Sequence, residues 1–446
     1  MYALVLAGLV LGSLLAGRQS GPAGLLVPVL GTGAMVLLPA AAAGALMVYC
    51  GVSARRRDDG TSTRGFWALS SVYPRATSII NALHIASYGI SLHFLGWGTV
   101  PEKVHVGDWG LPRGALIAVP FLASLVLAWI PLHYAETHIR RWGPTLGQQL
   151  SFNVRNYILT LCVPMAVALG AVDAVKFLPA PVAAVFDNPV TGAVAAGALI
   201  VGGYALAPML LVRVWKTSRL PECRLRERLT DLCRRIGVTF RDIRIWETPG
   251  LQFLNAAVMG IAGRVRYIVV SRPLIEAMSP EQVEAVFAHE LGHAKRHHIT
   301  YYLVFAADFV LLARLAEVAA NAPMLWSEAQ YTAIAAAALV LYWGVGFGYL
   351  SRAFERESDL FGAQTMGDTA LFASALEMIA HFNGISPAAR SWRHGSILSR
   401  VEFLRAAGSG GAGSAFLERV TFLKIFLIAL GAVTLAALGA TLARGW

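Results

Sequence analysis

The chain has 446 residues, of which 56% are hydrophobic and 14% are charged, and its formal net charge is +11. So apolar a composition excludes a mainly soluble protein and is typical of a multi-pass membrane protein that carries a modest polar domain. The positive residues lie in short segments beside apolar stretches, so the charge indicates membrane topology, and we expect no nucleic-acid partner.

Residues 1–213 form the first predicted region. Apolar stretches that are long enough to cross a bilayer, or nearly so, occupy positions 2–16, 27–50, 79–98, 114–134, 156–179 and 190–213. These stretches predict a six-span transmembrane region. The first is short, but it lacks a basic n-region and a small-residue cleavage site, so we expect a retained helix rather than a cleaved signal peptide.

Two segments between these stretches carry most of the arginines of the region. Arg55, Arg56, Arg57, Arg64 and Arg75 lie in 51–78, and Arg140, Arg141 and Arg155 lie in 135–155. The positive-inside rule places both segments in the cytoplasm, and alternation then places the chain from Lys216 onward there too. The amino-acid composition is rich in alanine, glycine and arginine, which is compatible with a protein of the bacterial inner membrane, the location we expect.

Charge density rises in residues 214–299, which we predict to be a cytosolic catalytic segment. A basic amphipathic helix over 222–236 would lie near anionic lipid or would pack on the domain, and the pattern favours neither. Strand-like runs follow over 238–246, 252–259 and 265–270, the last two joined by a turn through Gly260 and Gly263. A small sheet is therefore expected.

The pentapeptide HELGH, His289 to His293, ends this segment on a predicted helix. Ser279-Pro280-Glu281-Gln282 offers an N-cap, a proline at the first helical position and a glutamine three residues after the cap. A helix turns about 100° per residue, so His289 and His293 share a face and can bind one metal ion. Glu290 lies beside them, where it can take a proton from a water molecule. The alternative is a surface helix with two chance histidines.

Residues 300–350 are predicted to form a transmembrane hairpin, with arms at 300–321 and 329–350. Asp308, Arg314 and Glu317 make the first arm polar, so its charges face a bundle interior or the arm extends beyond the bilayer. A second catalytic segment, 351–407, follows. Residues 408–446 are expected to be a Gly-rich linker and a C-terminal transmembrane helix.

Two histidines leave a catalytic zinc ion one protein ligand short. Arg296 and Ile299 stand where the metzincin motif has Gly and His, so that class is excluded. Glu355 and Asp359 share a helix face as i and i+4, so Glu355 would bind the metal and Asp359 would accept the free N–H of a ligand histidine. Glu357 points about 200° away from Glu355. The alternative is an ordinary charged helix surface.

Four separated motifs resemble those of the gluzincin family that contains the HtpX-type membrane heat-shock proteases and the CAAX prenyl proteases. In chain order they are Asn255-Ala256 within LNAAVMG, HELGH with His298 after it, Glu355 with Asp359, and His394-Gly395-Ser396 with Arg400. The resemblance covers roughly 220–405. Ser358 departs from the family's E-x-x-A-D motif, and Gly395-Ser396 departs from its H-P-P-x-x-x-R motif.

The resemblance implies an α-helical multi-pass membrane protein with an inserted α+β gluzincin zinc-protease domain. The expected roles are one Zn²⁺ per chain on His289, His293 and Glu355, Asp359 as the partner of a ligand, Glu290 and His394 as catalytic residues, and Asn255 and Arg400 as substrate-binding residues. His394 would donate a hydrogen bond to the oxyanion. Asn255 would lie on an edge strand that pairs with an extended substrate.

The leading hypothesis is an integral-membrane zinc endopeptidase that hydrolyses membrane or membrane-proximal proteins at the cytoplasmic face, in quality control or processing. Its partners would be a protein or peptide substrate and the lipid bilayer, and the oligomeric state stays open. The alternative is a zinc-dependent membrane sensor or regulatory scaffold with little or no proteolysis. The intact HELGH and Glu355 favour the enzyme, because an inactive relative tends to lose its general base.

Overall fold

The computed structural model describes residues 24–58, 64–140, 143–182, 189–251, 253–320, 340–408 and 412–443, with isolated positions within 4–12 and 330–338. The chain divides into two compact units. One comprises residues 1–216 and 248–251, and the other comprises residues 217–247 and 252–446. Every candidate site residue of the sequence analysis therefore lies in the second unit.

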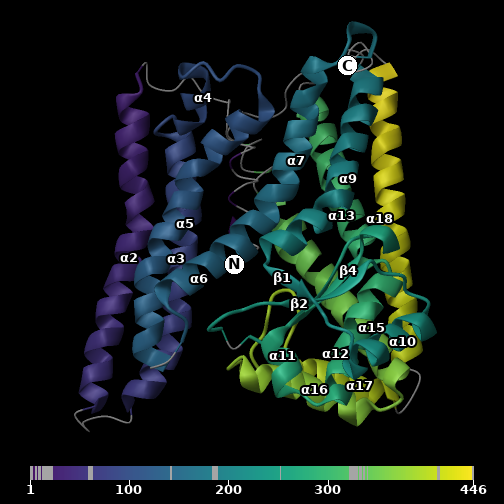
Figure 1. The fold of residues 1–446 in the computed structure, drawn as a ribbon. Coiled ribbons are helices and arrows are strands. Elements are labelled where there is room, and N and C mark those ends of the chain that lie inside the picture. The colour runs from purple at the N-terminus through teal and green to yellow at the C-terminus, as the bar shows by residue number, and fades with distance from the viewer. Residues whose placement is uncertain are drawn as a thin grey trace. The chain divides into compact units, whose positions relative to one another are not determined.

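The first unit is built from long helices, as its apolar stretches predict (Figure 1). Its elements are α2 (Leu26–Asp58), α3 (Arg64–His93), η1 (Trp97–Thr99), α4 (Val100–Lys103), α5 (Gly110–Arg140), α6 (Leu146–Asn153), the π-helix η2 (Val154–Leu159), α7 (Thr160–Ala174), η3 (Val175–Phe177) and α9 (Pro189–Val214). Helix α2 packs against α3 and α5, and α7 packs against α9. Most of the predicted first stretch, 2–16, lies outside the described residues.

Several helices are long and apolar enough to cross a bilayer. Four candidates occur among the described residues, at Leu26–Ala54, Gly110–Ile139, Leu146–Phe177 and Ala412–Ala440. The bent pair Arg75–His93 and Trp97–Lys103 makes a fifth if it is one span. The multi-pass class is confirmed. The full set of spans stays a prediction, because parts of 2–16 and 329–350 are not described.

The second unit combines a small sheet with helices (Figure 1). Its elements are β1 (Thr217–Arg219), α10 (Arg224–Ile236), β2 (Asp242–Trp246), β3 (Ala256–Met259), η4 (Gly263–Val265), β4 (Tyr267–Ser271), α11 (Arg272–Ala277), α12 (Pro280–Lys295), α13 (His298–Ala320), the π-helix η5 (Val340–Phe347), α15 (Gly348–Met366), α16 (Thr369–Phe382), α17 (Ile397–Gly408) and α18 (Ala412–Ala443). This arrangement confirms the expected combination of helical spans and a small mixed sheet.

The four strands follow the order β1-β2-β4-β3, so β3 is an edge strand. Strand β2 runs parallel to β4, with Ile243 opposite Ile268, whereas β3 runs antiparallel to β4, with Val258 opposite Ile268. All five residues of β4 are buried, which explains its continuous apolar run. Within the described part of the chain, no further strand pairs with the outer edge of β3.

The strands are shorter than the sequence predicted, and β1 was not predicted. Residues 238–241 continue the pattern of β2, and Val238 is buried in the core, but the partner strand β4 begins only at Tyr267. The short turn η4 lies before that residue, so residues 238–241 keep the alternating pattern but have no paired strand beside them. Strand β1 has three polar or charged residues, which carry no strand periodicity.

Helix α12 lies at the centre of the second unit, where it packs against α15, α16 and β3. It begins with the predicted capping box, in which Ser279 accepts from the Gln282 N–H and Gln282 bonds back to Ser279. Helices α12 and α15 approach closely at Gly292, where a Cβ atom would lie 3.1 Å from the Cα of Ser358. A small residue at each position therefore allows the histidines of one helix to reach the carboxylates of the other.

The predicted second arm of the hairpin continues into α15 without a break at Ser351. The π-helix η5 leads directly into α15, so the helix that carries Glu355 extends from an apolar segment. In the first arm, Asp308 is buried. Its carboxylate lies so close to Gly431 of α18 that any residue with a Cβ atom at position 431 would clash with it. Asp308 therefore faces a packed interior, one of the two expected alternatives. The side chains of Arg314 and Glu317 lie outside the described part.

Two arginines of α10 pack on the domain. Arg226 is buried and lies 2.9 Å from the Asp242 carboxylate, and Arg228 pairs with Glu281 and Glu284 of α12. The helix ends at Gly237, whose φ of 72° is the left-handed conformation that glycine adopts readily. For these two arginines, packing on the domain explains the basic pattern.

Candidate metal centre and active site

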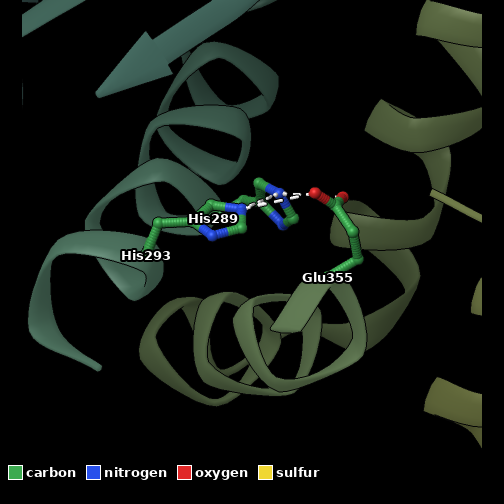
Figure 2. A group of neighbouring side chains, drawn as sticks. All are labelled: His289, His293 and Glu355. Atoms are coloured by element: carbon green, nitrogen blue, oxygen red, sulfur yellow. Dashed lines mark hydrogen bonds and ion pairs between the residues drawn. The ribbon is translucent and has the colours of Figure 1, made fainter. Parts of the chain in front are cut away.

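Three potential metal ligands converge from two helices. His289 and His293 project from α12 and Glu355 projects from α15, and one atom from each lies within 4.8 Å of the others (Figure 2). The Nε2 atoms of the two histidines are 3.2 Å apart, and each lies 3.6 Å from a Glu355 carboxylate oxygen. The structure thus brings together the three residues that the spacing predicted as ligands.

These separations fit a tetrahedral metal site. Ligand atoms placed about 2.0–2.1 Å from a tetrahedral zinc ion lie about 3.3–3.4 Å from one another. Two nitrogens and one carboxylate oxygen also form a common donor set of catalytic zinc, which leaves one coordination position for water or substrate. The two Nε2 atoms, 3.2 Å apart, can share either one proton or one metal ion.

The pKa values of the two histidines differ for a physical reason. Burial acts to lower the pKa of His289, but the carboxylates of Asp359 and Glu355 raise it to about 10. Burial lowers the pKa of His293 well below its ordinary value. The neighbouring carboxylates thus favour the protonated form of His289, whereas burial favours the neutral form of His293, and a metal ion would compete with protons for both rings.

Asp359 and Arg400 support His289 and Glu355. His289 Nδ1 lies 2.9 Å from Asp359 Oδ1. Arg400 donates two hydrogen bonds to Asp359, at 2.7 and 2.6 Å, and its Nη1 lies 3.3 Å from Glu355. Burial by itself would raise the pKa of Asp359, but Arg400 and then His289 hold it below the usual range. Arg400 is thus engaged with the carboxylates around the metal ligands, a position that the sequence analysis did not anticipate.

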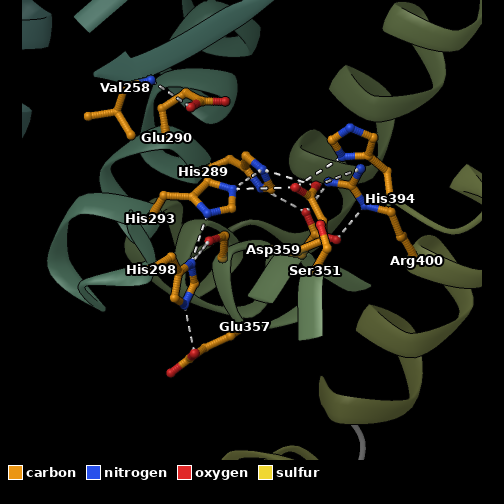
Figure 3. Close-up of polar contacts among 12 residues, drawn as sticks. Val258, His289, Glu290, His293, His298, Ser351, Glu357, Asp359, His394 and Arg400 are labelled. Atoms are coloured by element: carbon orange, nitrogen blue, oxygen red, sulfur yellow. Dashed lines mark hydrogen bonds and ion pairs between the residues drawn. The ribbon is translucent and has the colours of Figure 1, made fainter. Parts of the chain in front are cut away.

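His293 has a partner that the sequence analysis did not include among the site residues. Its Nδ1 lies 2.8 Å from Nδ1 of His298, whose Nε2 lies 2.8 Å from the Glu357 carboxylate (Figure 3). His297 adopts a left-handed backbone with φ 58°, so the chain turns between α12 and α13 and brings His298 beside His293. Glu357 points away from Glu355, as expected, and its carboxylate contacts His298 instead. The match of His298 to the family motif was the available signal.

Glu290 lies between the metal ligands and the edge strand. Its Oε2 accepts a hydrogen bond from the Val258 N–H of β3 at 3.1 Å (Figure 3). Burial raises the pKa of Glu290 to about 7, even though the positive charge of His289 opposes the shift. A carboxylate with a pKa near neutrality can both accept and return a proton, which suits the expected general base.

His394 lies at the outer side of the ligand group. It belongs to a short turn closed by a bridge between Ser391 and Gly395, and its Nδ1 lies 3.0 Å from Glu355 Oε1. The side chain is 48% exposed, whereas that of Glu355 is 6% exposed. His394 therefore combines contact with a metal ligand and access from outside. Gly395 adopts φ 73°, which glycine reaches readily and proline cannot adopt, so this turn has a different backbone from one with the proline of the family motif.

The edge strand β3 presents backbone groups next to Glu290. Asn255 precedes β3, and its backbone bonds to Ser271, with its N–H donating to the Ser271 hydroxyl and its carbonyl accepting from the Ser271 N–H. Because strand residues alternate in direction, Ala256 and Val258 turn their N–H and carbonyl groups away from β4. The outward edge beside the site thus consists of Ala256 and Val258 rather than Asn255.

Comparison with known families and proteins agrees with this geometry. Residues 219–408 match the family model of Peptidase family M48. A protease HtpX homolog from Bacteroides fragilis (strain YCH46) is 33% identical over 89 residues, which cover 19% of this chain and 27% of that protein. The plastoglobule-localized metallopeptidase 48 of Arabidopsis thaliana chloroplasts is 33% identical over 78 residues, or 18% of this chain and 22% of that protein. The matched segments thus span about a quarter of these relatives.

A solved structure resembles a larger part of the chain. The crystal structure of Ste24p from S. mikatae matches with a TM-score of 0.53 at 13% identity, covering 82% of this chain and 98% of that chain. At this identity the match shows a shared fold. The resemblance to the HtpX-type and CAAX-type proteases, which rested on four short motifs, is therefore confirmed at the level of family and fold.

Proposed function

Because residues 219–408 of this chain belong to Peptidase family M48, we propose that it is an integral-membrane zinc endopeptidase acting on membrane or membrane-proximal proteins. The observation that carries the proposal is the convergence of His289, His293 and Glu355 beside Glu290. Zinc, one ion per chain, is the metal we propose, because the donor set of two imidazoles and one carboxylate suits it.

The protein's own residues would divide the work of peptide hydrolysis. A zinc ion bound by His289, His293 and Glu355 would supply Lewis-acid activation of the attacking water and of the scissile carbonyl. Glu290 would accept the proton of that water and deliver it to the leaving amine. Its bond to Val258 uses one carboxylate oxygen, so the other oxygen can receive the proton.

The substrate would bind as an extended strand along β3. We propose that the N–H and carbonyl groups of Ala256 and the carbonyl group of Val258 pair with its backbone, because the Val258 N–H is bonded to Glu290. Asn255 would hold this edge in place through its bonds to Ser271. Backbone pairing provides affinity with little dependence on side chains, which suits a protease with many substrates. Arg400 would act indirectly, by positioning Asp359 and Glu355.

The active site would face the cytoplasm of a bacterial cell. Support comes from the arginines beside the predicted spans at 51–78 and 135–155, which the positive-inside rule places in the cytoplasm. The polar segment that follows Lys216 would lie on the same side. Membrane-proximal chain segments and misfolded membrane proteins are the substrates that such a location would offer.

Removal of the metal is expected to stop cleavage. Purified protein loaded with zinc should cleave an unfolded casein-like substrate. The chelator 1,10-phenanthroline should abolish this activity, because it removes the zinc ion that would act as the Lewis acid. Activity is followed by the release of labelled peptides. Re-addition of zinc should restore it. A zinc-loaded protein that binds the metal at this site but never cleaves would support the sensor or scaffold instead.

His394→Ala is expected to lower turnover by about 10²-fold or more while zinc stays bound. Its ring lies beside Glu355 and is open to the outside, so it could donate a hydrogen bond to the oxyanion as the reaction proceeds. The measurement compares kcat and zinc content with those of the wild type. His381→Ala, on α16, is a control for the loss of an imidazole outside the site. Unchanged turnover in His394→Ala would remove His394 from the mechanism.

A further inference from the structure

The C-terminal helix α18 carries a lysine that contacts the metal-binding domain. Lys424 Nζ lies 2.8 and 3.1 Å from the two carboxylate oxygens of Glu357, and 3.3 Å from the carbonyl oxygen of Arg296. Residue 296 is the C-cap of α12, the helix of the two histidine ligands. Lys424 lies outside residues 219–408, the range that matches the family.

The contacts of Lys424 continue to a metal ligand. Glu357 accepts from His298 Nε2, and His298 Nδ1 faces His293 Nδ1. His298 is completely buried and stacks on Phe354, with ring centroids 4.1 Å apart and planes 4° apart. Its ring is therefore held in one plane. The side chains of Glu357 and Lys424 are 5% and 11% exposed, so little solvent competes with these bonds.

The direction of the bonds determines the tautomers. A carboxylate only accepts, so His298 donates from Nε2, and the Nδ1 of the neutral ring then accepts. His293 must then donate from Nδ1, which leaves the lone pair of its Nε2 pointing toward His289 and Glu355. Metal binding requires that lone pair.

We propose that Lys424 of the C-terminal membrane helix is a positioning residue of the metal site, which acts through Glu357 and His298 to orient His293. The other histidine, His289, lies beside Asp359, which is bonded to Arg400. Each of the two histidines is therefore backed by a carboxylate that is paired with a positively charged side chain. The proposal deepens the proposed function, because it concerns the metal site on which that function rests. It also gives α18 a role beyond anchoring.

The test measures zinc affinity in the full-length protein by competition with a chromogenic chelator. Lys424→Met is expected to weaken zinc binding about 10–100-fold, as the loss of such supporting contacts does elsewhere. It should also change the visible absorption of the Co²⁺-substituted protein. Lys424→Arg, which can bond both oxygens of Glu357, should restore most of the affinity. Arg419→Met, which removes a positive charge from an exposed position of the same helix, is the matched control and should bind zinc like the wild type.

A double variant distinguishes the proposed chain of contacts from general destabilisation. Since the proposed route from Lys424 to His293 passes through Glu357, adding Lys424→Met to Glu357→Gln should cost little further affinity. Additive losses would overturn the proposal, as would wild-type affinity and an unchanged Co²⁺ spectrum in Lys424→Met. If Lys424→Met fails to fold, as judged by circular dichroism and size-exclusion chromatography, His298→Phe keeps the stack on Phe354 without ring nitrogens and should show the same loss.

The outcomes separate this inference from the proposed function. A protein that binds zinc in a Lys424-dependent manner but cleaves no substrate would retain the inference and refute the protease. A protein that cleaves substrate with unchanged zinc affinity in Lys424→Met and His298→Phe would retain the protease and refute the inference.

Discussion

Glu290→Gln is expected to lower kcat/KM for peptide hydrolysis by about 10²–10⁴-fold while zinc binding is kept. Glutamine preserves the shape of the side chain, and its carbonyl oxygen can still accept from the Val258 N–H. It cannot take up a proton near neutral pH, however. The attacking water would therefore lack a general base, and the leaving amine would lack a general acid. The measurement combines cleavage kinetics with determination of bound zinc.

A matched control for Glu290→Gln is Glu276→Gln, which removes an exposed carboxylate of α11. We expect that variant to cleave like the wild type. Normal turnover in Glu290→Gln would exclude Glu290 as the general base. Loss of zinc from Glu290→Gln would instead mean that the residue acts mainly on the shape of the site, so metal content must be determined on the same samples.

Glu355→Ala is expected to weaken zinc binding by more than about 100-fold, beyond the effect of losing a supporting contact. The variant removes one of the three protein ligands and also leaves the guanidinium of Arg400 without one of its carboxylate partners. A positive charge that is less fully balanced would then oppose the metal ion. Activity should be lost at zinc concentrations that saturate the wild type.

The control for Glu355→Ala is Glu402→Ala, at an exposed position of α17. It should retain both zinc and activity. Full zinc occupancy of Glu355→Ala, with a wild-type dissociation rate into a chelator, would exclude Glu355 as a ligand and with it the proposed architecture of the site.

Local patterns carried most of the site prediction. The HELGH spacing and the capping box are properties of one helix, and both occur in α12. Glu355 and Asp359 likewise share one face of α15, so their pairing with the histidines required only that two helices meet. Small residues such as Gly292 and Ser358 allow this approach, although their spacing does not identify the partner helix.

Contacts between distant segments were harder to predict. Glu357 was expected only to point away from the metal, and its direction toward His298 depends on the turn at His297. Arg400 matched a family motif, yet its bonds to Asp359 follow from the packing of α17 on α15. The ends of the strands also shifted, because a strand requires a partner in register as well as an alternating pattern.

The sequence by itself determined the membrane class, the capped HELGH helix and the three candidate metal ligands, because each depends on composition or on residue spacing along a helix. Only the tertiary structure decided which polar groups stand behind those ligands. Lys424, Glu357 and His298 come from three different helices, and their contacts join residues that are 59 and 67 positions apart in the sequence. Periodicity carries no information about packing at that range, since it describes the faces of a helix and leaves the neighbour of each face unspecified.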